Sequence, residues 1–232
     1  MKVKLLRYTT DAELLCGAAA LTSTRSGRPS KIFEEINVEM ARRIIKRVTG
    51  YGHASVIEHA SFTFSIEDVS RAMTHQLVRH RIASYTQQSQ RYVTYGSLEK
   101  YVTPPSISDN KEAKEIFDKT LEKISETYQK LLNMRIPKED ARFILSNAAK
   151  TNIIVTMNAR ELRHFFNLRC CARSQWEIRE VAIEMLNQAK KAASVLFENA
   201  GPSCVELGYC PEGKMKPQEC NIEEIKERFR SL

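Results

Sequence analysis

The strongest structural signal in this sequence of 232 residues is an amphipathic helix over residues 109–134. Apolar residues recur there at alternating spacings of four and three, and charged residues fill the other faces. The apolar stripe consists of Phe117, Leu121, Ile124, Tyr128 and Leu131. Because such a stripe has to be buried against other elements, this segment predicts a fold in which a long helix packs on a core.

Shorter segments predict a small sheet among further helices. Residues 61–66 alternate strictly between polar and apolar, as a half-buried strand does. Further strands are predicted over 3–8 and 152–157, helices over 10–20, 37–49, 70–78, 137–149, 159–170 and 174–199, and an irregular segment over 92–105. Thr10 with Glu13, and Ser174 with Glu177, have the spacing of capping boxes. Together these patterns predict an α+β fold: a single helix-rich domain over residues 1–232 around a β-sheet, with long amphipathic helices and with 201–232 as a C-terminal tail.

The composition is that of a soluble globular protein. Hydrophobic residues make up 42% of the chain and charged residues 28%, which argues against disorder. No apolar run is long enough to span a bilayer, and residues 1–4 lead into no signal-peptide core. We therefore expect a cytoplasmic protein with no membrane partner.

Six cysteines in a chain of this length do not make a dense disulfide framework, so reduced thiols are expected. Two groups of ligand-type residues have spacings that match no zinc pattern: His53, Glu58 and His59, and Cys204, Cys210 and Cys220. We therefore expect no metal.

The chain carries a net charge of +8, with 36 Lys and Arg against 28 Asp and Glu. Such an excess favours polyanionic partners, namely nucleic acid, acidic lipid or phosphorylated small molecules, although a basic solvated surface is the alternative.

Residues 76–92 contain three arginines and no acidic residue. Arg79 and Arg81 share a face only in an extended segment, as do Ser89 and Arg91. If they bind a ligand, the helix should end near Arg79, and an irregular loop should follow and form a phosphate cradle.

Three blocks in one order resemble the flavin-dependent thymidylate synthases. Arg79-His80-Arg81, followed after seven residues by Ser89, is similar to the RHR-x7-S motif of that family. The flanking blocks that resemble the family are Gly52-His53-Ala54-Ser55 with Glu58-His59 and the Phe62/Phe64 strand, then Asn158-Ala159-Arg160, Phe165–Arg169 and Gln175–Ile178. The resemblance covers residues 50–200. The chain departs from it at Thr86 and Gln87, where the family often has Asn and Glu.

The resemblance implies two ligand sites. Its FAD-binding residues would be Ser55, Arg79, His80, Arg81, Gln87, Asn158, Ala159, Arg160 and His164. Its dUMP-binding residues would be Gln76, Leu77, Val78, Arg79, Gln87, Gln88, Ser89, Gln90, Arg91, Arg142 and Arg169. It further implies NADPH as the reductant, 5,10-methylenetetrahydrofolate as the carbon donor, and a homotetramer whose neighbouring subunits share the sites. Several arginines suit these ligands because a buried pyrophosphate or phosphate needs charge compensation.

The implied reaction is the reductive methylation of dUMP to dTMP without an enzyme nucleophile. Arg169 would be the catalytic residue, stabilising negative charge on the pyrimidine near N3 and O2, while the flavin supplies the hydride chemistry. Cys170 is the tempting nucleophile, but adjacent side chains on a helix diverge by about 100°. Arg160 and His164 share a helical face, and Arg169 lies about 140° from His164. Either the helix ends before Arg169, or flavin and nucleotide occupy different sides of it.

Two other function classes are less well supported. A nucleic-acid-binding module would use the basic segment with Tyr85, Tyr92 and Tyr95 as stacking platforms. Such tyrosines are more often packing residues, so we expect no nucleic-acid partner. A hydrolase is disfavoured because the sequence has no G-x-S-x-G elbow.

Overall fold

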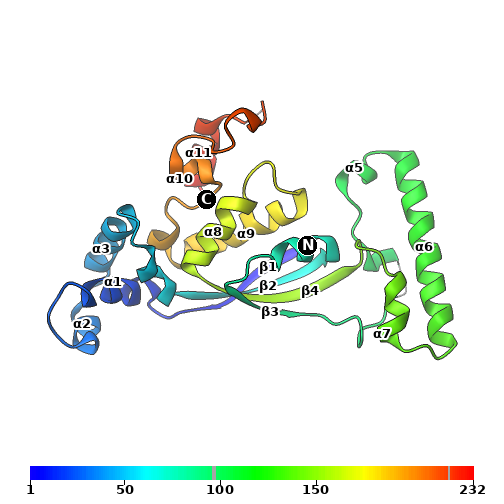
Figure 1. Cartoon of the computed structure of the whole chain (residues 1–232), viewed down its shortest axis with the longest axis horizontal. Helices are drawn as coiled ribbons and strands as arrows, with labels where there is room; N and C mark the ends of the chain where they lie inside the picture. Colours follow the sequence, from blue (N-terminus) through cyan, green and yellow to red (C-terminus); the bar gives the residue numbers. More distant parts are fainter. Residues whose placement is uncertain (96–97, 219) are drawn as a thin grey trace. The chain divides into compact units, whose positions relative to one another are not determined.

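The computed structural model describes residues 1–95, 98–218 and 220–232. Gly96 and Ser97, in the segment predicted to be irregular, and Glu219, in the predicted tail, lie outside the described residues. One sheet has the strand order β1-β2-β4-β3 (Figure 1). Its strands are β1 (Lys2–Tyr8), β2 (Ser61–Ser70), β3 (Ala83–Gln87) and β4 (Lys150–Asn158). Helices form most of the remaining ordered chain, so the predicted α+β class is confirmed.

The chain divides into two compact units, both discontinuous in sequence. Unit 1 comprises residues 1–2, 66–79 and 86–153, and unit 2 comprises 3–65, 80–85 and 154–232. Strands β2, β3 and β4 each have residues in both units. The prediction of one domain over residues 1–232 stays a prediction.

In unit 2, α1 packs closely on α3. The first helices of this unit are α1 (Ala12–Thr22), α2 (Pro29–Glu35), α3 (Val38–Gly50) and the short 3₁₀ helix η1 (Ala54–His59). A Cβ added at Gly17 would lie only 2.6 Å from the Cβ of Ala41, so the two helices approach at a point where only glycine fits. Ala18, Ile32, Ile36 and Ala41 form the buried cluster of this part.

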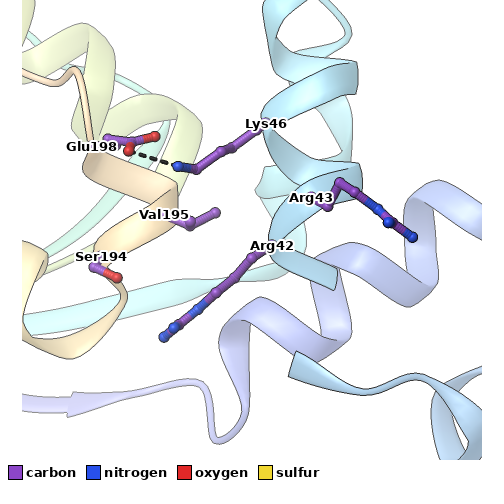
Figure 2. Close-up of a pocket in the computed structure, with 6 residues that line it drawn as sticks. All are labelled: Arg42, Arg43, Lys46, Ser194, Val195 and Glu198. Carbon is purple, nitrogen blue, oxygen red and sulfur yellow. Dashed lines mark hydrogen bonds and ion pairs between the residues drawn. The ribbon is translucent and has the colours of Figure 1, made fainter. Parts of the chain in front are cut away.

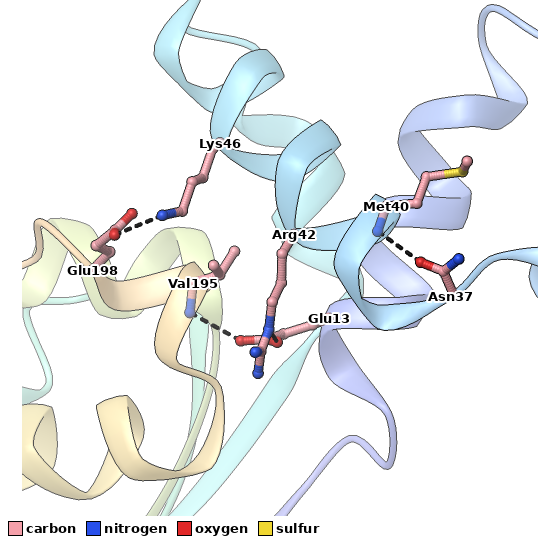
Figure 3. A network of polar contacts seen from close by, with 7 residues as sticks. All are labelled: Glu13, Asn37, Met40, Arg42, Lys46, Val195 and Glu198. Atoms are coloured by element: carbon pink, nitrogen blue, oxygen red, sulfur yellow. Dashed lines mark hydrogen bonds and ion pairs between the residues drawn. The ribbon is translucent and has the colours of Figure 1, made fainter.

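A polar network joins the same helices to a later segment of unit 2 (Figure 3). Arg42 Nε donates to Glu13 Oε2 at 2.6 Å, and the backbone N–H of Val195 donates to Glu13 Oε1 at 2.9 Å. The predicted capping box of Thr10 and Glu13 is therefore wrong. Glu13 serves tertiary partners, and α1 begins after Asp11, whose φ of 51° is left-handed and whose side chain makes no capping bond.

The remaining helices of unit 2 lie C-terminal to β4. They are α8 (Ala159–Arg169), α9 (Trp176–Ala192), η4 (Ser194–Phe197), α10 (Ser203–Leu207), η5 (Gly213–Met215) and α11 (Ile222–Arg230). Phe197 packs edge-on against Phe62 and Phe166, with ring centroids 5.2 and 6.0 Å apart. The predicted Ser174 cap of α9 is wrong, since Gln175 accepts the bonds from Glu177 N and Ile178 N while Ser174 donates to the carbonyl of Leu168. The described residues of the predicted tail, 201–232, form α10, η5 and α11, and Phe229 is buried.

Unit 1 is built on α6 (Lys111–Asn133), which confirms the long predicted helix. Leu121 and Tyr128 of its stripe are buried, and Phe117, Ile124 and Leu131 pack against the same cluster. The other helices of this unit are α4 (Arg71–Leu77), η2 (Leu98–Lys100), α5 (Pro105–Ser108), α7 (Lys138–Ala141) and η3 (Arg142–Ile144).

The predicted helix over 137–149 is wrong beyond η3. The backbone of 147–149 has tertiary partners instead of helical ones. Arg71 N donates to Ala149 O and Ala72 N to Asn147 O, both at 3.0 Å, and Val102 N donates to Ala148 O at 2.8 Å. These bonds give the carbonyl groups of 147–149 donors from residues distant in sequence, as buried backbone groups require.

Candidate active site

The arginine-rich segment begins with α4 and ends with a strand. Ser70 caps α4 by accepting from Met73 N at 3.0 Å, and the helix ends at Leu77 with Val78 as its C-cap. The predicted helix end near Arg79 is confirmed. The predicted irregular loop is wrong over 83–87, because this stretch forms β3 at one edge of the sheet.

His80 is the centre of a buried polar cluster in unit 2. Arg169, the last residue of α8, donates from Nε to His80 Nε2 at 3.1 Å. Because Nε2 accepts this bond, the proton of the neutral imidazole lies on Nδ1, which faces Glu161 Oε1 at 3.4 Å. The side chains of His80 and Glu161 are only 3% and 8% exposed. The sequence analysis missed Glu161, since a single acidic residue in the first turn of a helix is ordinary.

The electrostatics of this cluster keep His80 neutral. Burial first, then the charge of Arg169 and the neighbouring His164, lower the pKa of His80 from 6.5 to about 4. Burial raises the pKa of the Glu161 carboxyl, an effect that His164 partly opposes. At neutral pH Arg169 is therefore the cation of this group and His80 is a neutral acceptor for it.

The start of α8 places further predicted residues beside this cluster. Asn158 caps the helix by accepting from Glu161 N at 2.9 Å, and Ala159 is buried. Arg160 is exposed and pairs with Glu58. The ring of His164 lies 5.7 Å from that of His80, centroid to centroid. Because α8 runs through Arg169, the alternative that it ends earlier is wrong, and His80 contacts both His164 and Arg169.

A cleft of about 740 Å³ in unit 2 contains the predicted FAD residue Ser55. Its walls come from α1, α3 and the segment around η1, and they include Arg47, His53 and His59. The lining is mixed, with Leu21 and Val48 beside these polar groups. Such a combination of apolar walls and a few cationic or polar side chains suits an organic phosphate or a nucleotide fragment.

A second basic cavity of unit 2 is explained by internal ion pairs (Figure 2). Arg42 and Lys46 extend toward η4, where Lys46 Nζ lies 2.7 Å from Glu198 Oε1, while Arg43 points away. Arg42 is held by Glu13 as described above. Two of its three cations thus join α3 to α1 and to residues 194–198, so we assign this cavity a structural role.

In unit 1, three predicted dUMP residues lie around Glu139. Arg91 Nη2 is 2.9 Å from Glu139 Oε2, and Arg142 Nε donates to the carbonyl of Glu139 at 3.1 Å. Ser89 Oγ accepts from Arg91 N at 3.2 Å, and Ser89 O accepts from Tyr92 N and Val93 N. The turn over 89–93 therefore presents the Ser89 hydroxyl and the Arg91 guanidinium, and Arg142 of η3 contacts the same Glu139 as Arg91. Hydroxyls and guanidiniums of this kind can bind a phosphate group.

The side-chain amide of Gln87 bonds to other residues of unit 1. Its Nε2 donates to the hydroxyls of Thr74 and Thr151, at 3.0 and 3.3 Å, and both threonines are buried. The Thr74 hydroxyl already donates to Arg71 O, so it can only accept from residue 87. A glutamate carboxylate could not supply that proton, which explains the amide at this position.

The other predicted residues of the segment differ in exposure. Leu77 is fully buried and Val78 is 42% exposed. Gln88 is tied to Asn152 through its backbone N–H, and Gln76 and Gln90 are half-buried. Arg79 and Arg81 are exposed, and no carboxylate within the described ranges forms an ion pair with either.

The cysteine beside Arg169 is not suited to nucleophilic attack. Cys170 is 4% exposed, and burial raises the pKa of its thiol above the ordinary value. A thiol in this state stays protonated and inert.

Comparisons with known proteins agree with these features. Residues 4–194 match the family model of the thymidylate synthase complementing protein. The flavin-dependent thymidylate synthase of Geobacter sulfurreducens is 47% identical over 233 residues, covering 100% of this chain and 99% of that protein. That of Pyrococcus abyssi is 45% identical over 239 residues, covering 100% and 98%.

Two solved structures share the fold. Flavin-dependent thymidylate synthase ThyX from Helicobacter pylori, complexed with FAD and dUMP, matches with a TM-score of 0.70 at 24% identity, over 87% of this chain and 100% of that one. A UMP/dUMP methylase, PolB from Streptomyces cacaoi bound with 5-Br dUMP, matches with a TM-score of 0.71 at 26% identity, over 85% and 93%. Across the described ranges, no helix is both long and apolar enough to cross a membrane. The family model and the full-length relatives show that this chain belongs to the flavin-dependent thymidylate synthases.

Proposed function

We propose that this chain methylates dUMP to dTMP, with FAD as its cofactor, 5,10-methylenetetrahydrofolate as the carbon donor and NADPH as the reductant, and without an enzyme nucleophile. The observation that carries the proposal is Arg169 held by neutral His80 in a buried cluster. The relatives that match the whole chain are named flavin-dependent thymidylate synthases, which supports the proposal.

The residues available in unit 2 fit a flavin nucleotide. Its diphosphate needs cationic or N–H donors, and its ring and ribose need a partly apolar cleft. We propose that FAD is bound by residues of unit 2, namely Ser55, His80, Arg81, Asn158, Ala159, Arg160 and His164. We propose Arg79, a residue of unit 1, as a further FAD-binding residue. When bound, FAD supplies the redox chemistry of the reaction.

For dUMP we propose, in unit 1, the turn over 89–93 with Arg142 as the residues that bind the phosphate. In unit 2 we propose Arg169 as a residue that binds the pyrimidine. Residues 76–79, 88 and 90 would complete this binding segment. Gln87, whose amide already bonds Thr74 and Thr151, would hold the segment in place. We also propose a homotetramer in which neighbouring subunits complete the sites, as the resemblance to the family implies. We propose a cytoplasmic location and neither nucleic acid nor membrane as a partner.

The chemistry requires negative charge to build up on the pyrimidine before C5 becomes a nucleophile. A guanidinium whose orientation is fixed in advance stabilises that charge without reorganising during the reaction. Arg169 meets this requirement because its Nε–H is directed to His80, which fixes the plane of the side chain. His80 carries no charge of its own at neutral pH, so it does not repel the cation that it positions.

The test compares Arg169→Ala with the unchanged chain. We expect Arg169→Ala to retain FAD, seen by its visible absorbance, and to lose dTMP formation by about 100-fold or more, the scale of removing one such donor. Arg169→Lys should rescue poorly because an ammonium lacks the planar fork. Arg7→Ala, an exposed position on β1, is the matched control and should keep normal activity.

Two outcomes would overturn the proposal. A purified wild-type protein that binds no FAD would remove the cofactor on which the reaction depends. Turnover within a few-fold of normal in Arg169→Ala would remove the proposed catalytic role.

A further inference from the structure

Five of the six cysteines converge on one cavity in unit 2. Cys170, Cys171, Cys204, Cys210 and Cys220 all line a space of about 370 Å³, whereas Cys16 is buried in α1. All six lie in the described part of the chain and are reduced. The five come from three stretches: the end of α8, the short helix α10, and the two sides of η5. Their convergence is a property of the fold, because Cys170 and Cys171 lie far from the other three cysteines in sequence.

Charged contacts anchor these stretches to one another. Glu206 of α10 accepts from Arg163 Nη2 at 2.7 Å and from Asn167 Nδ2 at 3.3 Å, which ties α10 to α8. Glu212, two residues after Cys210, pairs with Arg173, two residues after Cys171. Lys216 Nζ donates to the carbonyl of Cys220 at 2.7 Å. The backbones of the four less buried cysteines are thus brought to one place.

Glycines with left-handed backbone conformations lie on either side of Cys210. Gly208 and Gly213 have φ values of 79° and 54°, left-handed conformations that glycine adopts at little cost. They reverse the chain just before and just after Cys210. Cys210 thereby lines the same cavity as Cys171, Cys204 and Cys220.

The C-terminal segment has little apolar core to hold it. Among residues 203–218 and 220–232, Val205 and Phe229 are the side chains that reach full burial. Two apolar anchors are few for a segment that folds into α10, η5 and α11. Small units with such sparse cores are commonly stabilised by a disulfide or a structural metal.

We propose that Cys171, Cys204, Cys210 and Cys220 form a four-thiolate site for a thiophilic metal centre that fixes residues 201–232. Four sulfur ligands are the donor set of a structural zinc ion or an iron–sulfur cluster. Cys170 is excluded as a ligand because it is almost completely buried and packs with the core. Within the described residues, no group of three or more His, Cys, Asp or Glu is already arranged to hold a metal ion, so binding has to draw the four thiols inward.

The charge balance supports this assignment. With zinc, the four thiols lose four protons and bind Zn²⁺, which leaves a net charge of −2. The cavity is lined by four cations, Arg173, Arg179, Lys216 and Arg228, and by two glutamates, Glu180 and Glu212. Arg173 is paired with Glu212, so the remaining cations outnumber the remaining carboxyl group and can compensate the charge.

The test is the metal content of the full-length chain. We expect purified protein, kept under reducing and oxygen-free conditions, to contain either about one zinc per chain or iron with acid-labile sulfide. Cys204→Ser and Cys210→Ser should each lower that content at least about tenfold, the scale of losing a metal ligand. Cys16→Ala and Cys170→Ala are matched controls and should keep it.

A second measurement uses the wild-type chain, so that the proposal can still be tested if the serine variants do not fold. Wild-type chain stripped of metal and titrated with Co²⁺ should give the intense thiolate charge-transfer absorption of a tetrahedral sulfur site. The proposal is overturned if the wild type contains neither metal and does not bind Zn²⁺ or Co²⁺. It is equally overturned if mass spectrometry finds the four cysteines in stable disulfides, or if the serine variants keep the metal. None of these readouts depends on dTMP formation, so they stand apart from the proposed enzymatic function.

Discussion

The buried position of His80 makes the stability of the protein depend on pH in a predictable direction. The pKa of His80 falls from 6.5 to about 4 on folding, so the unfolded chain binds a proton more readily than the folded one. Stability is therefore lost as pH falls from about 6.5 toward about 4. The whole pKa difference of His80 corresponds to a loss of roughly 3 kcal/mol in the free energy of unfolding. About 2 kcal/mol of this loss occurs between pH 7 and pH 5.

The perturbation that isolates this effect is His80→Gln. Glutamine offers an amide oxygen that can accept from Arg169 Nε, and it does not titrate. The assay is denaturant unfolding of both proteins at pH 7 and pH 5, at fixed protein and FAD concentration. Carboxyl groups elsewhere titrate in both proteins and cancel in the comparison. We expect wild type to lose about 2 kcal/mol more than His80→Gln between the two pH values.

Equal losses in the two proteins would refute the reasoning. So would an imidazole resonance of His80 that titrates near 6.5 in nuclear magnetic resonance spectra. Either result would mean that Nε2 is not held as an acceptor for Arg169. The role of His80 in positioning Arg169 would then be wrong as well.

Two further predictions test other parts of the structure. Replacing both Arg79 and Arg81 by Ala should give a folded but colourless protein, because both exposed cations are proposed to compensate the charge of FAD; an absorbance spectrum showing stoichiometric flavin would contradict it. Gly17→Ala should lower the free energy of unfolding by about 1–3 kcal/mol, since the added Cβ would lie 2.6 Å from that of Ala41, whereas Gly50→Ala, with nothing within 4 Å, should be nearly neutral. Equal effects of the two substitutions in denaturant unfolding would argue against the close approach of α1 and α3.

Hydrophobic periodicity correctly predicted elements whose buried apolar face is formed by residues of one continuous segment. The stripe of α6 is an example, because its residues alone specify the face that packs on the unit 1 cluster. Strand β3 was missed because Ala83–Gln87 is short and mostly polar, so its extended form depends on pairing within the sheet. The helix predicted through Ala149 failed for a related reason, since the carbonyls of 147–149 accept from Arg71, Ala72 and Val102. In each failure a partner distant in sequence decides the backbone.

In the candidate site, too, the sequence predicted residue types, whereas the contacts between distant residues could not be predicted from it. The resemblance to the family identified His80 and Arg169 by type and order, but not the bond between them. Glu161 gave no signal in the sequence, because a carboxylate in the first turn of a helix is commonplace. Its role becomes visible only when His80 is placed against α8. Likewise, the amide at Gln87 has a reason only once Thr74 is seen to donate elsewhere.

Placing a neutral imidazole between Glu161 and Arg169 has a chemical advantage over a direct ion pair. A carboxylate bonded directly to Arg169 would offset the positive charge on which the proposed role of Arg169 depends, and it would compete with the proposed pyrimidine ligand for the guanidinium. Here Glu161 faces only Nδ1 of His80, which fixes the tautomer, and Nε2 then accepts from Arg169. Glu161 thus orients the ring of His80, and His80 orients the guanidinium of Arg169. The imidazole lies between the carboxyl group and the guanidinium. The lowered pKa of His80 belongs to the same arrangement, because a protonated ring could neither accept from Arg169 nor sit beside it without repulsion. The three side chains thus give the proposed catalytic arginine a fixed orientation while a neutral group is its bonded neighbour.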